Sequence, residues 1–145
     1  MPTRIAHTSW TGGLEEGSGQ VELSSSKVGT FDVSFPRRAA EDADGVTSPE
    51  ELIGAAHSSC YAMQLSALIA AAGGTPRSLD VTAAVSLGPD SPGLKLTGIT
   101  LTVRGHADGL DADGFLRVAQ EAKTTCPVSK ALTGVEITLD AELVN

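Results

Sequence analysis

A long helical segment, from Ser48 to about Ala72, constrains the fold of this chain more than any other feature. Ser48 can cap the helix and Pro49 suits its first turn. Two glutamates, Glu50 and Glu51, then favour the positive end of the helix dipole. The segment stops at a pair of glycines, and its interior is rich in alanine and nearly uncharged. These features predict a central helix that is buried on most sides.

Segments in which apolar and polar residues alternate predict strands on both sides of this helix. The predicted strands are Ile5–Thr11, Gln20–Leu23, Thr30–Phe35, Leu79–Leu87, Leu94–His106 and Val135–Val144. Asp111–Thr125 predicts a second capped helix, and Val128–Leu132 predicts one further helical turn. The polar stretch Pro36–Val46 predicts a loop. This order of elements predicts an α+β fold in which the central helix packs on a sheet.

The composition excludes several classes of protein. A chain of 145 residues fits one domain, residues 1–145, and can bury a core. A net charge of −8 argues against binding to nucleic acid or to an anionic membrane surface. The first residues lack the apolar stretch of a secretory signal. Together with the presence of only two cysteines, this predicts a cytoplasmic protein.

The two cysteines are the main candidates for chemistry. Cys60 lies midway along the long apolar helix, and Cys126 precedes a proline in Thr-Thr-Cys-Pro-Val-Ser-Lys. Each alone could be a buried structural thiol. A pair that meets in space could instead cycle between dithiol and disulfide. Their spacing in the sequence does not say whether they meet.

Arg38 and Glu50 also admit two interpretations. Arg38 could be a solvated loop cation, and Glu50 a favourable charge in a first helical turn. Alternatively, Arg38 holds the Cys60 thiolate while Glu50 orients the guanidinium through a bidentate pair. Ten helical residues, about 15 Å, separate Glu50 from Cys60. An antiparallel copy of the helix could bring the two together, so we hypothesise a site that is shared across a homodimer.

His57 lies one turn before Cys60 on the same face of the helix. A Cys–His nucleophile pair and a metal site completed by Cys126 are both conceivable. A histidine that is simply packed, with its polar atoms satisfied, is the alternative.

Two motifs resemble the OsmC/Ohr family of thiol peroxidases, and the likeness extends from about Thr8 to Leu143. The first is Ser-Pro-Glu-Glu-Leu-Ile-Gly-Ala-Ala-His-Ser-Ser-Cys-Tyr-Ala-Met (Ser48–Met63). The second is Cys-Pro-Val-Ser-Lys-Ala-Leu (Cys126–Leu132). The first motif is closer to the OsmC branch than to the Ohr branch.

The resemblance implies an intertwined α+β homodimer with two antiparallel β-sheets around a long buried central helix. It implies reduction of organic hydroperoxides, with Cys60 as the peroxidatic cysteine and Cys126 as the resolving one. By the same resemblance Glu50 orients a catalytic arginine from the preceding loop, for which we choose Arg38, with Arg37 as the alternative.

The implied cycle needs an organic hydroperoxide and an external dithiol, for which a lipoylated protein is a candidate. It needs no metal, flavin or haem. Two other functions remain open from the residues alone. The chain could be a redox-switched sensor or binding protein, or a stable fold with inert thiols that binds zinc through His57.

Overall fold

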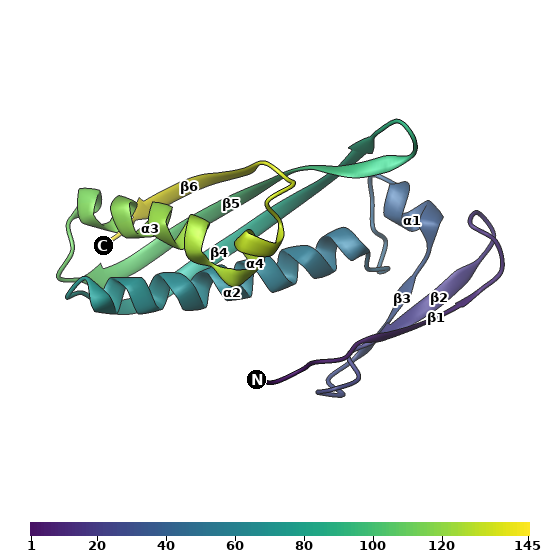
Figure 1. Cartoon of the computed structure of the whole chain (residues 1–145), viewed down its shortest axis with the longest axis horizontal. Coiled ribbons are helices and arrows are strands. Elements are labelled where there is room, and N and C mark those ends of the chain that lie inside the picture. Colours follow the sequence, from purple (N-terminus) through teal and green to yellow (C-terminus); the bar gives the residue numbers. More distant parts are fainter. The chain divides into compact units, whose positions relative to one another are not determined.

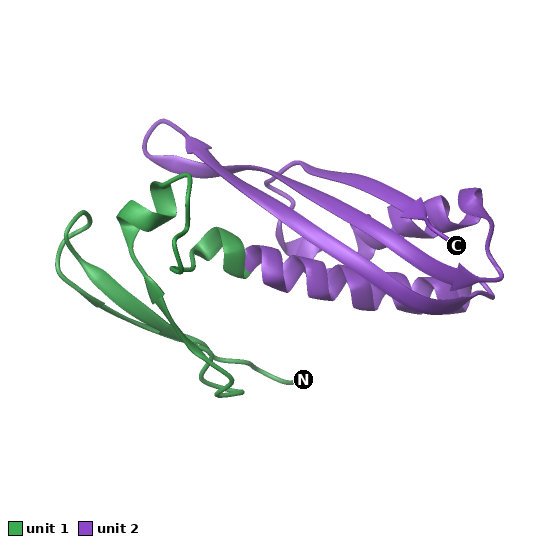
Figure 2. Ribbon diagram, turned by 180° about the vertical axis from the view of Figure 1, so that it is seen from behind, with its two compact units in different colours: residues 1–52 green, residues 53–145 purple.

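The computed structural model describes all residues, 1–145, as two compact units, residues 1–52 and 53–145 (Figures 1 and 2). Its element order is β1 His7–Thr11, β2 Ser18–Glu22, β3 Thr30–Val33, α1 Phe35–Ala39, α2 Pro49–Ala71, β4 Thr75–Pro89, β5 Leu94–Asp108, α3 Ala112–Thr125, α4 Pro127–Ala131 and β6 Ile137–Leu143. The α+β class, with two sheets and a long helix, is confirmed. None of the helices combines the length and apolar character needed to cross a membrane.

The first unit is a three-stranded antiparallel sheet, ordered β1-β2-β3, followed by the short helix α1. We predicted residues 36–46 as loop, and α1 corrects this expectation at its first residues. The side chain of Ser34 caps α1 by accepting a hydrogen bond from the Arg37 N–H, and Pro36 occupies the first turn. The loop that remains returns the chain to the start of α2.

The second unit packs α2 and α3 against a sheet ordered β4-β5-β6. β4 and β5 are antiparallel, but β5 and β6 are parallel. This pairing corrects the expectation of two wholly antiparallel sheets. The physical reason is the length of the connection between β5 and β6. It contains α3 and α4, which carry the chain back to the end of the sheet where β5 begins, so β6 runs in the same direction as β5.

Both long helices begin and end as their sequences predict. Ser48 accepts a hydrogen bond from the Glu51 N–H at the start of α2, and Asp111 accepts one from Gly114 at the start of α3. At the end of α2, Gly73 has a positive φ of 89° and the Gly74 N–H bonds back to the carbonyl of Ile69. This is the glycine-dependent helix end that the paired glycines indicate.

The core of the second unit lies between the helices and one face of the sheet. Alternate residues of β5 point into it, as a half-buried strand requires. Its fully buried side chains come from α2 (Tyr61, Leu65, Ile69), from β5 (Ile99, Leu101, Val103) and from α3 (Phe115, Ala119, Ala122). The opposite side of α2 is not covered within the chain, and Met63 there is 73% exposed.

Neighbouring residues of α3 test this account of the core. Phe115 is fully buried, whereas Leu116 is 42% exposed. We expect Phe115→Ala to lower the free energy of unfolding by about 3–5 kcal/mol, because the ring leaves a closed cavity. Leu116→Ala should cost no more than about 1 kcal/mol. Urea denaturation measures both; equal losses would show that α3 packs differently.

Candidate functional site

The two cysteines meet, although they come from different elements. Cys60 lies in the middle of α2, and Cys126 forms the junction between α3 and α4. Their sulfur atoms are 3.0 Å apart and both thiols are free. Cys126 is fully buried, whereas Cys60 is partly exposed. Because a disulfide has a sulfur–sulfur distance of about 2.05 Å, a small shift would allow the bond to form.

The surroundings of Cys60 do not by themselves stabilise a thiolate. Burial raises the pKa of the Cys60 thiol above its usual value, and the hydrogen bond with Cys126 raises it further. A backbone interaction with Val128, in the first turn of α4, acts in the opposite direction. No positive charge contributes to this balance. A reactive thiolate at Cys60 therefore needs a cation that these neighbours do not supply.

Arg38 and Glu50 form a bidentate pair, the second of the two interpretations of these residues. Arg38 Nη2 donates to Glu50 Oε1 at 2.8 Å, and Nε donates to both carboxylate oxygens at 3.1 and 3.2 Å. Glu50 is buried, and the Arg38 side chain remains 33% exposed. The guanidinium is thus held in a fixed orientation, and Nη1 takes no part in these bonds.

Arg37, the alternative to Arg38, points elsewhere. Its Nη2 lies 3.2 Å from a carboxylate oxygen of Asp44, in an exposed ion pair. Consecutive positions on the short helix α1 give the two arginines different directions. Of the two candidates, Arg38 is the one that contacts Glu50.

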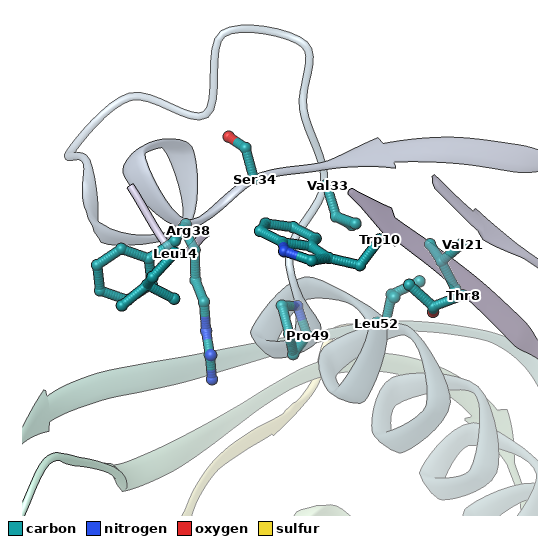
Figure 3. Close-up of a pocket in the computed structure, with 10 residues that line it drawn as sticks. Thr8, Trp10, Leu14, Val21, Val33, Ser34, Arg38, Pro49 and Leu52 are labelled. Atoms are coloured by element: carbon teal, nitrogen blue, oxygen red, sulfur yellow. The ribbon is translucent and has the colours of Figure 1, made fainter. Parts of the chain in front are cut away.

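A cavity of about 470 Å³ opens beside Arg38 within the first unit. Figure 3 shows the Trp10 ring lying inside this group of side chains, with Arg38 along one edge. The lining residues are Thr8, Trp10, Leu14, Val21, Val33, Ser34, Phe35, Arg38, Pro49 and Leu52. Most of these side chains are apolar, so the cavity suits an apolar group that carries a polar end near the guanidinium.

His57 is fully buried, and its ring bonds to a serine and to neither thiol. Its Nε2 lies 2.8 Å from Ser129 Oγ in α4, and its Nδ1 has no hydrogen-bond partner. No group of three or more His, Cys, Asp or Glu side chains lies together in a way that could hold a metal ion. His7 and His106 lie in the exposed parts of β1 and β5.

Two polar contacts lie next to the thiols and were not predicted from the sequence. One is the His57–Ser129 contact, and the other joins Gln64 Nε2 to Thr125 Oγ1 at 2.9 Å. Ser129 and Thr125 flank Cys126 in its motif, and that position was the only available signal. Nothing in the sequence identifies their partners on α2.

The folded chain is thus an α+β protein with a juxtaposed pair of free thiols. Residues 42–140 match the family model described as OsmC-like protein. The chain belongs to the OsmC-like protein family. This confirms the resemblance that the two cysteine motifs indicated.

The relatives agree with this assignment. Peroxiredoxin OsmC of Escherichia coli (strain K12) is 41% identical over 134 residues, which are 92% of each chain. Organic hydroperoxide resistance protein OhrA of Bacillus subtilis (strain 168) is 35% identical over 144 residues, 97% of this chain and 96% of that protein. The crystal structure of OhrB of Bacillus subtilis has a TM-score of 0.72 at 27% identity, and the match covers 97% of this chain and 98% of that one.

The buried histidine predicts a specific dependence of stability on pH. Burial lowers the pKa of His57 in the folded chain below its ordinary value of 6.5. Between these two values the unfolded chain binds more protons, so stability falls as the pH drops below about 6.5. His57→Gln, which can still reach Ser129, should remove up to about 1.4 kcal/mol of this loss per pH unit. Urea denaturation of both proteins at about pH 7.5 and about pH 5 measures the difference; parallel losses would exclude His57 as the cause.

Proposed function

We propose that this protein is a thiol-dependent peroxidase that reduces organic hydroperoxides to alcohols through Cys60 and Cys126. Membership of a family whose relatives are named peroxiredoxin and organic hydroperoxide resistance protein makes it a peroxidase-type enzyme. The substrate class and the role of each residue are the proposal. The observation that carries it is the 3.0 Å separation of two free thiols on different elements.

The proposed reaction uses the thiols in order. The Cys60 thiolate attacks the distal oxygen of the peroxide, the O–O bond breaks, and an alcohol leaves after gaining a proton. Cys60 is now a sulfenic acid, and Cys126 condenses with it to form a disulfide and water. An external dithiol then reduces the disulfide by exchange, for which a lipoylated protein is our candidate. Because sulfur carries both electrons, the cycle needs no metal, flavin or haem.

Arg38 supplies the positive charge that the surroundings of Cys60 lack. The raised pKa of Cys60 supports a requirement for a nearby cation, and Glu50 already holds the Arg38 guanidinium in place. In the proposed reaction Arg38 stabilises the thiolate and then the negative charge that develops on the leaving oxygen. Glu50 acts through Arg38 as a positioning residue.

We place this arginine across a homodimer. Glu50 and Cys60 both belong to α2, and the ten residues between them correspond to about 15 Å of helix. An antiparallel α2 from a second chain would bring the partner subunit's Glu50 and the partner subunit's Arg38 to Cys60. The exposed side of α2 supports this arrangement, because it carries small or apolar residues: Ala55, Ala56, Ser59 and Met63.

The cavity beside Arg38 supports an organic substrate rather than hydrogen peroxide. Its largely apolar lining, with Trp10 at its centre, suits an alkyl or aryl group. Arg38 would then bind the peroxide at the polar end of the same molecule. Hydrogen peroxide has no group that would fill the cavity.

Turnover distinguishes an enzyme from a redox-switched sensor. With cumene hydroperoxide and dihydrolipoamide, the wild-type protein should consume many equivalents of peroxide, whereas Cys60→Ser should consume none above background. Cys126→Ser should react once per chain and then stall or overoxidise. A wild-type protein that stops after one equivalent in excess reductant would be a sensor, and an unchanged rate in Cys60→Ser would end the proposal.

Mixed dimers test whether the site is shared. Arg38→Gln should lower kcat/KM by about 100-fold or more, because it removes charge stabilisation; Arg37→Gln is the matched control and should stay close to wild type. Co-expressed Cys60→Ser and Arg38→Gln chains would form dimers of which half are mixed, each with one intact site. About a quarter of wild-type activity should therefore return. No recovery in dimers verified as mixed would place the whole site within one chain.

A further inference from the structure

Three contacts join α2 to residues 125–129, where α3 ends and α4 begins, and the thiol pair is the middle one of the three. On one side Gln64 Nε2 donates to Thr125 Oγ1 at 2.9 Å. On the other side His57 Nε2 and Ser129 Oγ are 2.8 Å apart. Figure 1 shows α4 and the end of α3 lying along the middle of α2. A polar bond therefore lies at each side of the cysteines.

The two bonds differ in burial, but both attach the residues around Cys126 to α2. His57 and Ser129 are buried, so their bond is shielded from water. Gln64 and Thr125 are partly buried, and the Thr125 hydroxyl also donates to the carbonyl of Glu121 at 2.8 Å. This second bond orients the hydroxyl so that its oxygen accepts from Gln64. Each bond links α2 to a residue within three positions of Cys126.

Cys126 needs such support because of where it lies. It is the last residue before Pro127 and links two helices, with φ −56° and ψ 127°, outside helical values. Its side chain makes no capping hydrogen bond to α4. The helix α4 has only five residues, which is too short to be rigid without tertiary contacts. The Cys126 backbone bonds to Ala122 and Lys130, but its sulfur has a hydrogen bond only with Cys60. The direction of the sulfur therefore depends also on what holds the residues around Cys126.

We propose that the Gln64–Thr125 and His57–Ser129 bonds form a thiol clamp that holds the Cys126 sulfur within bonding reach of Cys60. The four residues are positioning residues for the resolving step. The clamp determines whether the Cys60 sulfenic acid becomes a disulfide or is oxidised further. This inference rests on the proposed peroxidase function for its chemistry, but not for its geometry.

The step that the clamp serves is balanced within the chain and its substrate. The Cys126 sulfur attacks the sulfenyl sulfur of Cys60, a sulfur–sulfur bond forms, and the S–O bond breaks. Hydroxide leaves and takes the thiol proton, so the product is water. Cys126 is oxidised and the Cys60 sulfur is reduced. A second hydroperoxide that reaches the sulfenic acid first gives a sulfinic acid and an alcohol instead.

The clamp therefore sets the peroxide concentration at which the protein inactivates itself. The rate of disulfide formation does not depend on the peroxide concentration, because the step is intramolecular. The rate of overoxidation rises in proportion to the peroxide concentration, so the two rates are equal at one particular concentration of peroxide. Misplacement of a reacting group by about 1 Å can cost about 100-fold in rate. We expect loss of one end to slow resolution by about 10-fold, and loss of both ends by up to about 100-fold. The concentration that gives half-inactivation should fall by the same factor.

The Gln64–Thr125 end of the clamp is only partly buried, so substitutions there disturb folding least. Thr125→Val removes the hydroxyl at almost constant volume, and Thr125→Ser keeps it and should restore resolution. Thr124→Val is the matched control, because the Thr124 hydroxyl also donates to Glu121 but makes no bond to α2. Ser129→Ala breaks the buried end, and Ser129→Ala combined with Thr125→Val breaks both. Circular dichroism and urea denaturation select the variants that fold.

Rapid mixing with cumene hydroperoxide, acid quenching and mass spectrometry follow the sulfenic acid, disulfide and sulfinic acid separately. The expected result is a slower disulfide step and more sulfinic acid in Thr125→Val and Ser129→Ala, with Thr125→Ser and Thr124→Val like wild type. The proposal is overturned if the variant with both ends broken forms its disulfide at the wild-type rate. It is also overturned if Thr124→Val slows that step as much as Thr125→Val.

A second measurement needs no peroxide and so separates the clamp from the function. The dithiol–disulfide equilibrium of the protein against glutathione gives the effective concentration of the Cys126 thiol at Cys60. Thr125→Val should lower this concentration by about 10-fold, which corresponds to about 30 mV in the reduction potential. If the wild type fails to turn over peroxide but this shift is present, the proposed function is wrong and the clamp stands. An unchanged potential in the variant with both ends broken would reject the clamp.

Discussion

The packing of α2 against the core face of β5 is the constraint on which the rest of the second unit depends. Tyr61, the residue after Cys60, points into this core, and its hydroxyl donates to the carbonyl of Ala119 in α3 at 2.9 Å. One buried side chain thereby fixes the rotation of α2 and the depth of α3. Since Cys126 follows the last residue of α3, this packing brings the backbone of Cys126 beside Cys60. The direction of the Cys126 sulfur within that space is what the two flanking hydrogen bonds refine.

Local signals were sufficient for most of the fold. Ser48 and Asp111 cap helices because their side chains accept bonds from N–H groups three residues ahead. Such short-range chemistry can be read from the sequence. The parallel pairing of β5 with β6 could not be predicted in this way, because it depends on where α3 returns the chain. The short helix α1 was missed because its cap, Ser34, lay in a segment that we interpreted as a strand.

Only part of the candidate site could be predicted from the sequence, because several of its contacts join residues that lie far apart in the chain. Family resemblance led us to choose Arg38, with Arg37 as the alternative. The structure gives a physical difference, since Arg38 pairs with Glu50 and Arg37 with Asp44. The meeting of Cys60 and Cys126 followed from family resemblance and not from their spacing. The bonds of Gln64 and His57 join residues far apart in the chain, so a single sequence holds no signal for them.

The parallel pairing of β6 also affects how the chain matures during synthesis. Cys60 and its helix precede the sheet in the sequence, whereas Cys126 follows α3, which packs against β6, Ile137–Leu143. That strand follows Cys126 in the sequence and leaves the ribosome after it. A nascent chain therefore carries Cys60 before its partner thiol is in place. The native contacts around Cys126 can therefore be complete only after β6 has been synthesised and has paired with β5.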